Sequence, residues 1–229
     1  MRFRSHMAPA IAVIALAGCQ AGGTATLESD DQMSSYSIGL EIGTSLRSTG
    51  DHLDMPALLK GLDDALDERD PALPREDLQA ARQRVAQLIQ EEQVTEQASA
   101  GEKNQAEGEA YLAQNATKEG VTTTASGLQY EVLRGGDGPT PTRSNQVKIH
   151  YRGTLVDGTE FDSSYERGLP ATFGVTGVIA GFSEGLQLMS VGSQYRLVIP
   201  GNLAYGPGGQ GSIGPNATLI FEIELIEIL

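Results

Sequence analysis

The chain has 229 residues, 39% of them hydrophobic and 20% charged, which is enough for one large domain or two small domains with hydrophobic cores. Its formal net charge at pH 7 is −14. A charge of this sign opposes binding to the phosphate backbone of nucleic acids and to anionic lipid head groups, so nucleic acid is not an expected partner.

The first residues have the pattern of an export signal. Arg2 and Arg4 precede an apolar run at residues 7–18 that is too short to span a bilayer. The run ends in Leu-Ala-Gly before Cys19, which resembles the lipobox of bacterial lipoproteins, where the cysteine is acylated and becomes the first residue of the mature chain. We therefore expect a lipoprotein signal peptide at residues 1–18. The alternative is an ordinary signal peptide followed by an incidental cysteine.

A lipid on Cys19 would anchor the exported chain to a membrane. Cys19 is the only cysteine, so no intrachain disulfide can form. By resemblance to the lipoproteins of Gram-negative bacteria, Gln20 in place of an aspartate favours the outer membrane, with the protein facing either the periplasm or the cell surface. Residues 19–31 are mostly small and polar and are expected to form a flexible tether.

Helical periodicity begins at Gln32. Ile38, Ile42 and Leu46 are four residues apart, and a second amphipathic segment starts at Pro56. Two short helices have too little sequence to enclose a core, so their apolar faces need a partner. We therefore expect residues 32–100 to form an intertwined helical homodimer. An autonomous monomeric helical hairpin is the alternative.

A third and much longer helix is expected to connect this region to the next domain. It opens after Pro74 and continues without proline, so residues 75–116 are predicted to form one helix that acts as a strut. Gly101 and Gly108 weaken this prediction, because glycine disfavours the interior of a helix.

After Gly120 the hydrophobic pattern changes to a period of two, which is typical of half-buried strands. Val147, Ile149 and Tyr151 alternate with polar residues, and the alternation returns at residues 195–199 and 219–229. A short helical segment flanked by glycine lies at residues 181–189. The sequence therefore predicts an α+β protein, with an all-helical N-terminal region followed, at residues 121–229, by an antiparallel sheet wrapped around one short helix.

The C-terminal domain has few groups for covalent or metal chemistry. His150 is its only histidine, and alternation places it on the solvent face of its strand, so neither a metal cluster nor a nucleophilic triad is expected. The glycine-rich run at residues 206–211 has no lysine and leads into a strand, so we interpret it as a loop or flap and not as a phosphate-binding loop. No cofactor and no metal are expected.

Six short motifs in the C-terminal domain are distinctive. They read VKIHYRG at 147–153, DGTEFDSS at 157–164, VIAGF at 178–182, MSVG at 189–192, AYG at 204–206 and GPNATL at 214–219. Together they resemble the FKBP-type peptidyl-prolyl cis-trans isomerases, which rotate the bond before proline. The resemblance implies an FKBP-like fold, proline-containing polypeptides as substrates and macrolides of the FK506 and rapamycin class as inhibitors.

The N-terminal half resembles the dimerisation domain of the macrophage infectivity potentiator (Mip) subgroup. The likeness lies in SYSIG at 35–39 and GEAYL at 108–112, ahead of SGLQY at 126–130. It implies a V-shaped homodimer in which the long helices hold two isomerase domains apart. A role in interaction with a host or neighbouring cell is suggested only by this subgroup resemblance and by no residue of the sequence itself.

The family's pocket carries over to eleven positions of this sequence. The expected catalytic residues are Tyr151, Asp162, Phe182, Tyr205 and Phe221, and the expected substrate-binding residues are Phe161, Arg167, Phe173, Val178, Ile179 and Ile213. Phe182 would be the floor beneath the proline ring, the Ile179 N–H and the Tyr205 hydroxyl would donate hydrogen bonds to substrate carbonyls, and Asp162 would orient the site.

Some of these residues have simpler explanations. Asp162 could cap a turn, and Phe161, Phe173 and Phe221 could serve the core as well as the ligand. Many relatives have tryptophan where this chain has Phe182, which offers less area and no indole donor, so activity is expected to be lower. The alternative function is a dimeric chaperone or peptide-binding module with weak isomerase activity.

Overall fold

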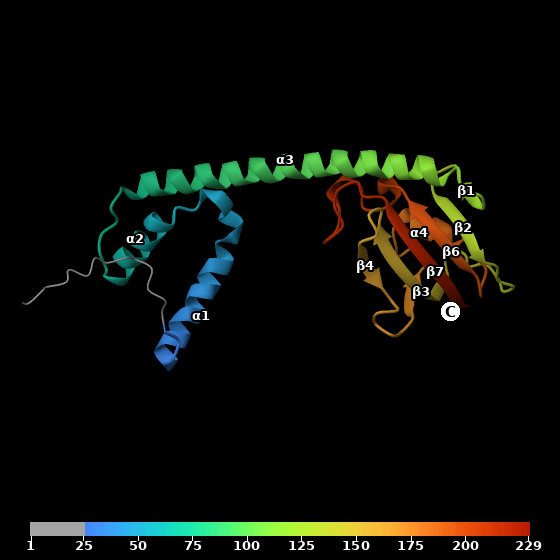
Figure 1. Cartoon of the computed structure of the whole chain (residues 1–229), viewed down its shortest axis with the longest axis horizontal. Helices are drawn as coiled ribbons and strands as arrows, with labels where there is room; N and C mark the ends of the chain where they lie inside the picture. The colour runs from blue at the N-terminus through green and yellow to red at the C-terminus, as the bar shows by residue number, and fades with distance from the viewer. Residues whose placement is uncertain (1–25) are drawn as a thin grey trace, which may run out of the picture. The chain divides into compact units, whose positions relative to one another are not determined.

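The structure, a computed structural model, describes residues 26–229. The expected signal peptide, Cys19 and most of the tether lie outside the described residues. The chain divides into two compact units, one ending at Leu78 and the other running from Gln79 to Leu229. Figure 1 shows a helical first unit and a second unit in which part of a long helix accompanies a sheet. The predicted α+β fold class is confirmed.

Short helices with capped ends form the first unit. They are α1 (Asp30–Ser45), the 3₁₀ helix η1 (Arg47–His52) and α2 (Met55–Leu66). The Ser29 side chain accepts a hydrogen bond from the Gln32 N–H, and the Gln32 side-chain oxygen accepts one from the Ser29 N–H. This capping box explains why α1 begins two residues before the periodic pattern. Asp54 caps α2 with a single hydrogen bond, which its side chain accepts from the Ala57 N–H.

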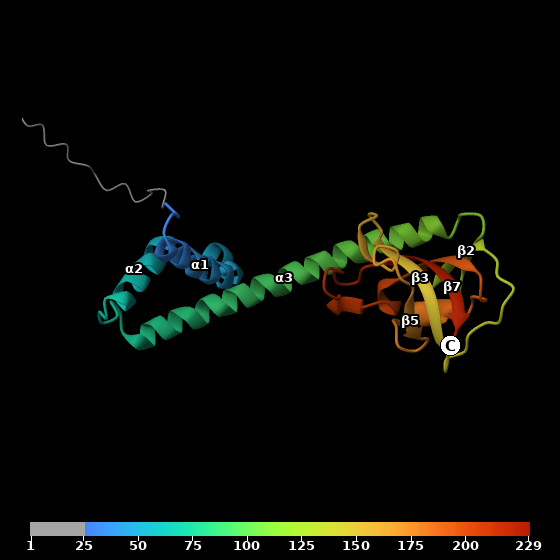
Figure 2. The same ribbon diagram turned by 90° about the horizontal axis from the view of Figure 1, so that it is seen from below.

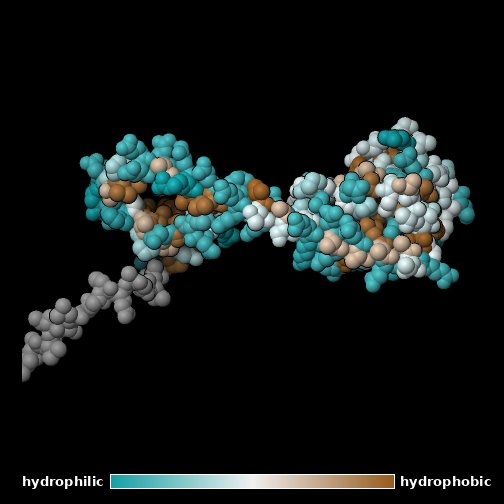
Figure 3. Space-filling view, turned by 90° about the horizontal axis from the view of Figure 1, so that it is seen from above, coloured by the Kyte–Doolittle hydropathy of each residue, from teal (hydrophilic) through white to brown (hydrophobic). Residues whose placement is uncertain are grey.

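Apolar side chains of the first unit remain exposed to solvent. Within residues 26–78, the part of this unit that the structure describes, no residue is buried. A groove of about 560 Å³ runs between the helices, and its lining includes Ile42, Leu46, Leu58, Leu59 and Leu62. Figure 3 shows hydrophobic residues gathered in this hollow. The unit therefore presents an uncovered apolar face.

The long helix α3 (Arg75–Asn115) has 41 residues, of which only Gly101, Gly108 and Asn115 are buried. All three lie in its second half, where the helix packs against the C-terminal sheet domain within residues 79–229. Figure 2 shows this half of α3 running beside the strands. The glycines that weakened the helix prediction are thus contact positions.

The C-terminal domain contains one antiparallel sheet. Its strands are β1 (Val121–Thr123), β2 (Gln129–Arg134), β3 (Gln146–Leu155), β4 (Glu160–Ser163), β5 (Ala171–Gly174), β6 (Gln194–Ile199) and β7 (Leu219–Ile228). They are arranged in the order β1-β2-β6-β7-β3-β4, with β5 also paired to β3. The two central strands, β3 and β7, are ten residues long and pair along nearly their whole length.

The core lies between this sheet and the helix α4 (Ala180–Leu186). The alternation predicted for the last strand is observed, since Leu219, Phe221, Ile223 and Leu225 are all buried. Phe182 of α4 packs into the same cluster. Two 3₁₀ turns, η2 (Gly201–Leu203) and η3 (Gly206–Gly208), were not predicted, and they shape the segment between β6 and β7. The core thus ends at a rim of loops and turns.

Candidate active site

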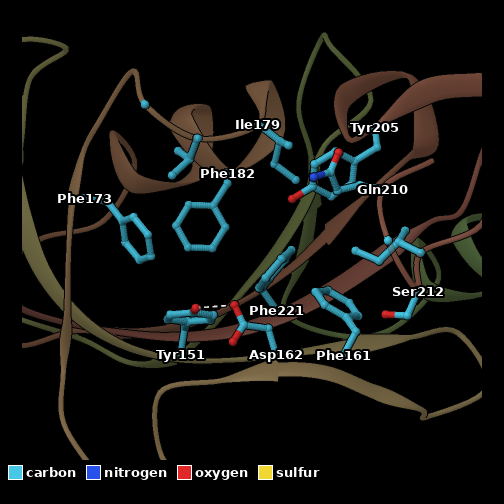
Figure 4. A pocket seen from close by; sticks show the side chains of 14 residues that line it. Tyr151, Phe161, Asp162, Phe173, Ile179, Phe182, Tyr205, Gln210, Ser212 and Phe221 are labelled. Carbon is cyan, nitrogen blue, oxygen red and sulfur yellow. Dashed lines mark hydrogen bonds between the residues drawn. The ribbon is translucent and has the colours of Figure 1, made fainter. Parts of the chain in front are cut away.

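A cavity of about 480 Å³ opens at this rim. Its volume lies in the range of small-molecule and peptide sites. The lining residues come from β3, β4, β5, β7, α4 and two loops: Tyr151, Phe161, Asp162, Phe173, Gly177, Val178, Ile179, Phe182, Tyr205, Gln210, Gly211, Ser212, Ile213 and Phe221. In Figure 4 the rings of Phe173, Phe182 and Tyr151 lie near one another, and Tyr205 lies on the far side from Phe173.

Edge-to-face ring contacts build the base of the cavity. The Phe182 and Phe221 centroids are 4.9 Å apart at 87°, and the Phe161 and Phe221 centroids are 5.5 Å apart at 83°. Tyr151 meets Phe182 at 6.3 Å and Phe173 at 5.7 Å. This geometry is the preferred one for aromatic pairs. The rings therefore form a rigid, apolar floor that also belongs to the core.

Gly153 on β3 makes this packing possible. A Cβ at this position would lie 2.6 Å from the Phe161 ring and 2.8 Å from the Phe221 ring, far inside van der Waals contact. The two rings therefore approach over the bare backbone of β3. The glycine is required by this close contact and not by its backbone angles.

One wall carries a closed triangle of polar side chains. The Tyr151 hydroxyl donates a hydrogen bond to one oxygen of Asp162, and Arg167 donates to the other. Arg167 also donates to the Tyr151 oxygen at 2.8 Å, and its guanidinium carbon lies 5.5 Å from the centre of the Tyr151 ring. Each member is thus held by the other two.

These contacts change the acidity of both acidic members. Partial burial raises the pKa of the Asp162 carboxyl, but hydrogen bonds from Tyr151 and Arg167 outweigh burial, so the net pKa lies below the ordinary 3.8. Burial, and then the hydrogen bond to Asp162, raises the pKa of Tyr151 above its ordinary 10.0. The triangle therefore combines an ionised Asp162 with a protonated Tyr151 near neutral pH.

The opposite wall is a flap, residues 206–216. Gln210 and Ile213 exchange backbone hydrogen bonds of 2.8 and 2.9 Å, which makes the tip a small hairpin. The Asn216 N–H donates to the Gly206 carbonyl at 2.7 Å and closes the base. Ile213 is only 7% exposed and packs with the core, so the flap is fixed on its inner side.

Ten of the eleven positions taken from the resemblance line this one cavity. The eleventh, Arg167, reaches it through Tyr151 and Asp162. Four further lining residues were not predicted as site residues: Gly177, Gln210, Gly211 and Ser212. Gln210 and Gly211 do lie in the glycine-rich run that the sequence analysis interpreted as a loop or flap.

His150 is less exposed than the strand alternation predicted. It is half-buried, its ring stacks on Tyr165 with centroids 4.7 Å apart, and its Nδ1 lies 2.9 Å from the Ser164 hydroxyl. The Ser164 oxygen accepts a hydrogen bond from the Tyr151 N–H at 2.8 Å. His150 therefore supports the strand behind the site. The alternation correctly predicted which face of β3 carries His150, but the loop after β4 covers that face at this position.

The cavity has a mostly apolar lining with a few polar groups, which is suited to holding and orienting an apolar ligand. Among residues 26–229 no group of three or more histidine, cysteine, aspartate or glutamate side chains is placed to hold a metal ion. The polar groups of the rim, the Asp162 carboxylate and the Tyr205 hydroxyl, are suited to orienting an amide.

Comparison with known proteins identifies the family. The family model "FKBP-type peptidyl-prolyl cis-trans isomerase" matches residues 138–226, and the model "Domain amino terminal to FKBP-type peptidyl-prolyl isomerase" matches residues 31–132. The FKBP-type 22 kDa peptidyl-prolyl cis-trans isomerase of Escherichia coli K12 is 44% identical over 211 residues, which cover 90% of this chain and 99% of the relative. The chain belongs to the FKBP-type peptidyl-prolyl cis-trans isomerases.

Other relatives of this isomerase agree with the assignment. The outer membrane protein MIP of Legionella longbeachae is 38% identical over 96% of this chain and 95% of the relative. The crystal structure of FkpA from Escherichia coli matches with a TM-score of 0.70 and 36% identity, over 89% of this chain and 98% of that one. Among residues 26–229 no helix is both long and apolar enough to cross a membrane.

Proposed function

We propose that this isomerase acts on proline-containing segments of exported polypeptides, and that it holds the X–Pro amide without covalent help in the cavity around Phe182. The observation that carries the proposal is the combination of a ring-lined floor with the Tyr151–Asp162–Arg167 triangle on one wall. No covalent bond is broken in the reaction, so the site needs no nucleophile.

The physical problem is amide resonance. Rotation about the X–Pro bond breaks that resonance at a barrier of about 20 kcal/mol. The twisted amide is less polar than the planar one, so an apolar, water-poor cavity stabilises the transition state more than the ground state. Lowering the barrier by about 8 kcal/mol would accelerate rotation about a millionfold.

Each residue then has a proposed task. Phe182 supports the proline ring, since it contacts the rings of both Tyr151 and Phe221 and is only 4% exposed. The Ile179 N–H and the Tyr205 hydroxyl donate hydrogen bonds to substrate carbonyls. Asp162, held by Tyr151 and Arg167, orients the amide that rotates.

A proline-peptide exchange assay tests this proposal. We expect catalysed exchange by the wild type, inhibition by a macrolide of the FK506 class, and a loss of about tenfold or more in Tyr205→Ala and Asp162→Ala. Exchange in all three proteins that is indistinguishable from the peptide alone would refute the assignment of the site.

We also propose that residues 32–100 form a homodimer through the apolar groove of the first unit. The support is the groove itself, in which Leu59 is 57% exposed and Leu62 45% exposed. Burying such a face against a second copy removes apolar area from water and completes a core that the unit lacks alone.

Two matched variants on α2 test the dimer. Leu62 lines the groove, whereas Leu66, one turn later, does not and is 75% exposed. We expect Leu62→Glu to sediment as a single chain, because a charge in the interface is costly, and Leu66→Glu to sediment like the wild type. A dimer in both variants would exclude the groove as the interface.

A second candidate function is capture of unfolded chains by the helical unit. Leu66 and Leu73 are exposed apolar residues outside the groove, which favours this function. Suppression of client aggregation should then persist in Tyr205→Ala, whose pocket is impaired. Loss of suppression in parallel with isomerase activity would assign both effects to the pocket.

We further propose that the protein is exported and anchored to the outer membrane through a lipid on Cys19. The support is the sequence of residues 1–19 and the similarity to the Legionella longbeachae relative. Cells given a labelled fatty acid should label the wild type in the membrane fraction and leave Cys19→Ser unlabelled. Equal labelling of both proteins would contradict the anchor.

A further inference from the structure

The second half of α3 packs against residues 214–218, which are the last three residues of the flap and the two residues that lead into β7. A Cβ at Gly108 would lie 2.2 Å from the Thr218 hydroxyl oxygen and 3.1 Å from the Thr218 Cβ. At Gly101 it would lie 3.3 Å from the Asn216 side-chain nitrogen. Glycine disfavours a helix interior, so its presence here is explained by this close approach.

Asn104 stands between these two glycines and makes a polar contact with the flap. Its Nδ2 donates a hydrogen bond of 2.8 Å to the Pro215 carbonyl. Gly214 faces the same amide, because a Cβ there would lie 2.8 Å from Nδ2. Asn104 is therefore hydrogen-bonded to the flap two residues beyond Ile213, a residue that lines the cavity.

Besides the contact with Asn104, the flap is held on its inner side by Ile213 and at its base by its own backbone. The Asn216 N–H closes its base on the Gly206 carbonyl, and Asn216 has a positive φ of 55°. The tip is held by the reciprocal hydrogen bonds of Gln210 and Ile213. A contact from outside the loop therefore restricts how far the tip can move away from the cavity.

We propose that Asn104 is a positioning residue for the cavity: through the Pro215 carbonyl it keeps the flap, and with it Ile213, at the cavity wall before substrate binds. The long helix is then part of the isomerase site and more than a connector. The inference rests on the proposed function, because it concerns the same cavity. A ligand that binds a preformed wall does not have to order it, so loosening the wall weakens binding.

The experiment compares variants of the full chain that each lose one helix-to-domain hydrogen bond. Asn104→Ala removes the donor, and Asn104→Asp keeps the shape but sets a carboxylate against a carbonyl. The control is Asn115→Ala, on the same helix, because the Asn115 Nδ2 donates at 2.9 Å to the Gln129 side chain on β2, away from the flap.

For both Asn104 variants we expect KM for a proline peptide to rise about threefold to tenfold, with kcat within about twofold of the wild type. Hydrogen exchange at the Gln210 and Ile213 amides should accelerate as well. The control should lose thermal stability and keep the wild-type KM and flap exchange.

Wild-type KM and wild-type flap exchange in the Asn104 variants would overturn the proposal, and so would an equal rise in KM in the control. Absence of catalysis in the wild type would instead count against the proposed function. In that case hydrogen exchange at Gln210 and Ile213 still reports whether Asn104 holds the flap.

Discussion

The two units of this chain differ in how far their apolar residues are buried. In the sheet domain, Leu197, Ile223 and Leu225 are fully buried, and the core is continuous from β2 to β7. In the helical unit, Leu59 and Leu62 sit in an open groove, and no residue between 26 and 78 is buried. One unit has completed its core within a single chain, and the other has not.

Geometry explains the contrast. A sheet whose long central strands pair on both sides can enclose a helix such as α4, so a single copy removes its apolar face from water. Two short helices, α1 and α2, have no such layer to pack against. Amphipathic patterning therefore accompanies a closed core in the sheet domain and an open apolar groove in the helical unit.

Truncating one apolar residue in each unit should change stability in different ways. Ile223→Ala should destabilise the sheet domain by about 2–5 kcal/mol at any protein concentration, because it leaves a cavity in a closed core. Leu59→Ala should cost stability only where the dimer is populated. Calorimetry at two protein concentrations measures both. A concentration-independent loss for Leu59→Ala would show that the helical unit is complete alone.

A second pair of variants adds a methyl group to each unit. Gly153→Ala should lower isomerase activity about tenfold or more, because its Cβ collides with Phe161 and Phe221 and displaces the floor of the cavity. Gly61→Ala on α2 meets no atom within 4 Å and should stabilise its helix by about 1 kcal/mol. Unchanged peptide turnover in Gly153→Ala would contradict the role given to the ring packing.

The charge states of Asp162 and Tyr151 predict how activity depends on pH. The pKa of Asp162 is lowered, so its contribution to stability is present above the unfolded value of 3.8 and is lost as pH falls through its folded pKa. The pKa of Tyr151 is raised, so its contribution is present below 10.0 and is lost as pH rises through its folded pKa. Peptide exchange should therefore be constant from about pH 5 to pH 9. A titration step within this pH interval that disappears in Asp162→Asn would contradict the charge states assigned to the triangle.

Much of the fold was predictable because its signals are local. The alternation at residues 219–229 predicted β7, and Pro56 and Pro74 placed the starts of α2 and α3 to within a residue. The cavity was predictable only through the family resemblance, since composition alone would assign Phe161 and Phe221 to the core.

The features that were missed depend on residues far apart in the sequence. Gly108 weakened the helix prediction. The structure explains this glycine by the close approach of Thr218, which lies 110 positions later. The partner of Asn104, the Pro215 carbonyl, is equally remote. His150 was placed on the correct face of β3, but nothing near it in the sequence indicated that Tyr165 would cover that face.

We infer that the isomerase site is complete in one copy of the chain, whereas the helical unit is complete only in two copies. The most direct test measures sedimentation and proline-peptide exchange on the same samples of wild type and Leu62→Glu. We predict that Leu62→Glu is a single chain with the wild-type exchange rate per mole. A monomer whose exchange rate per mole collapses while its sheet domain remains folded would contradict the claim, as would a variant that stays dimeric.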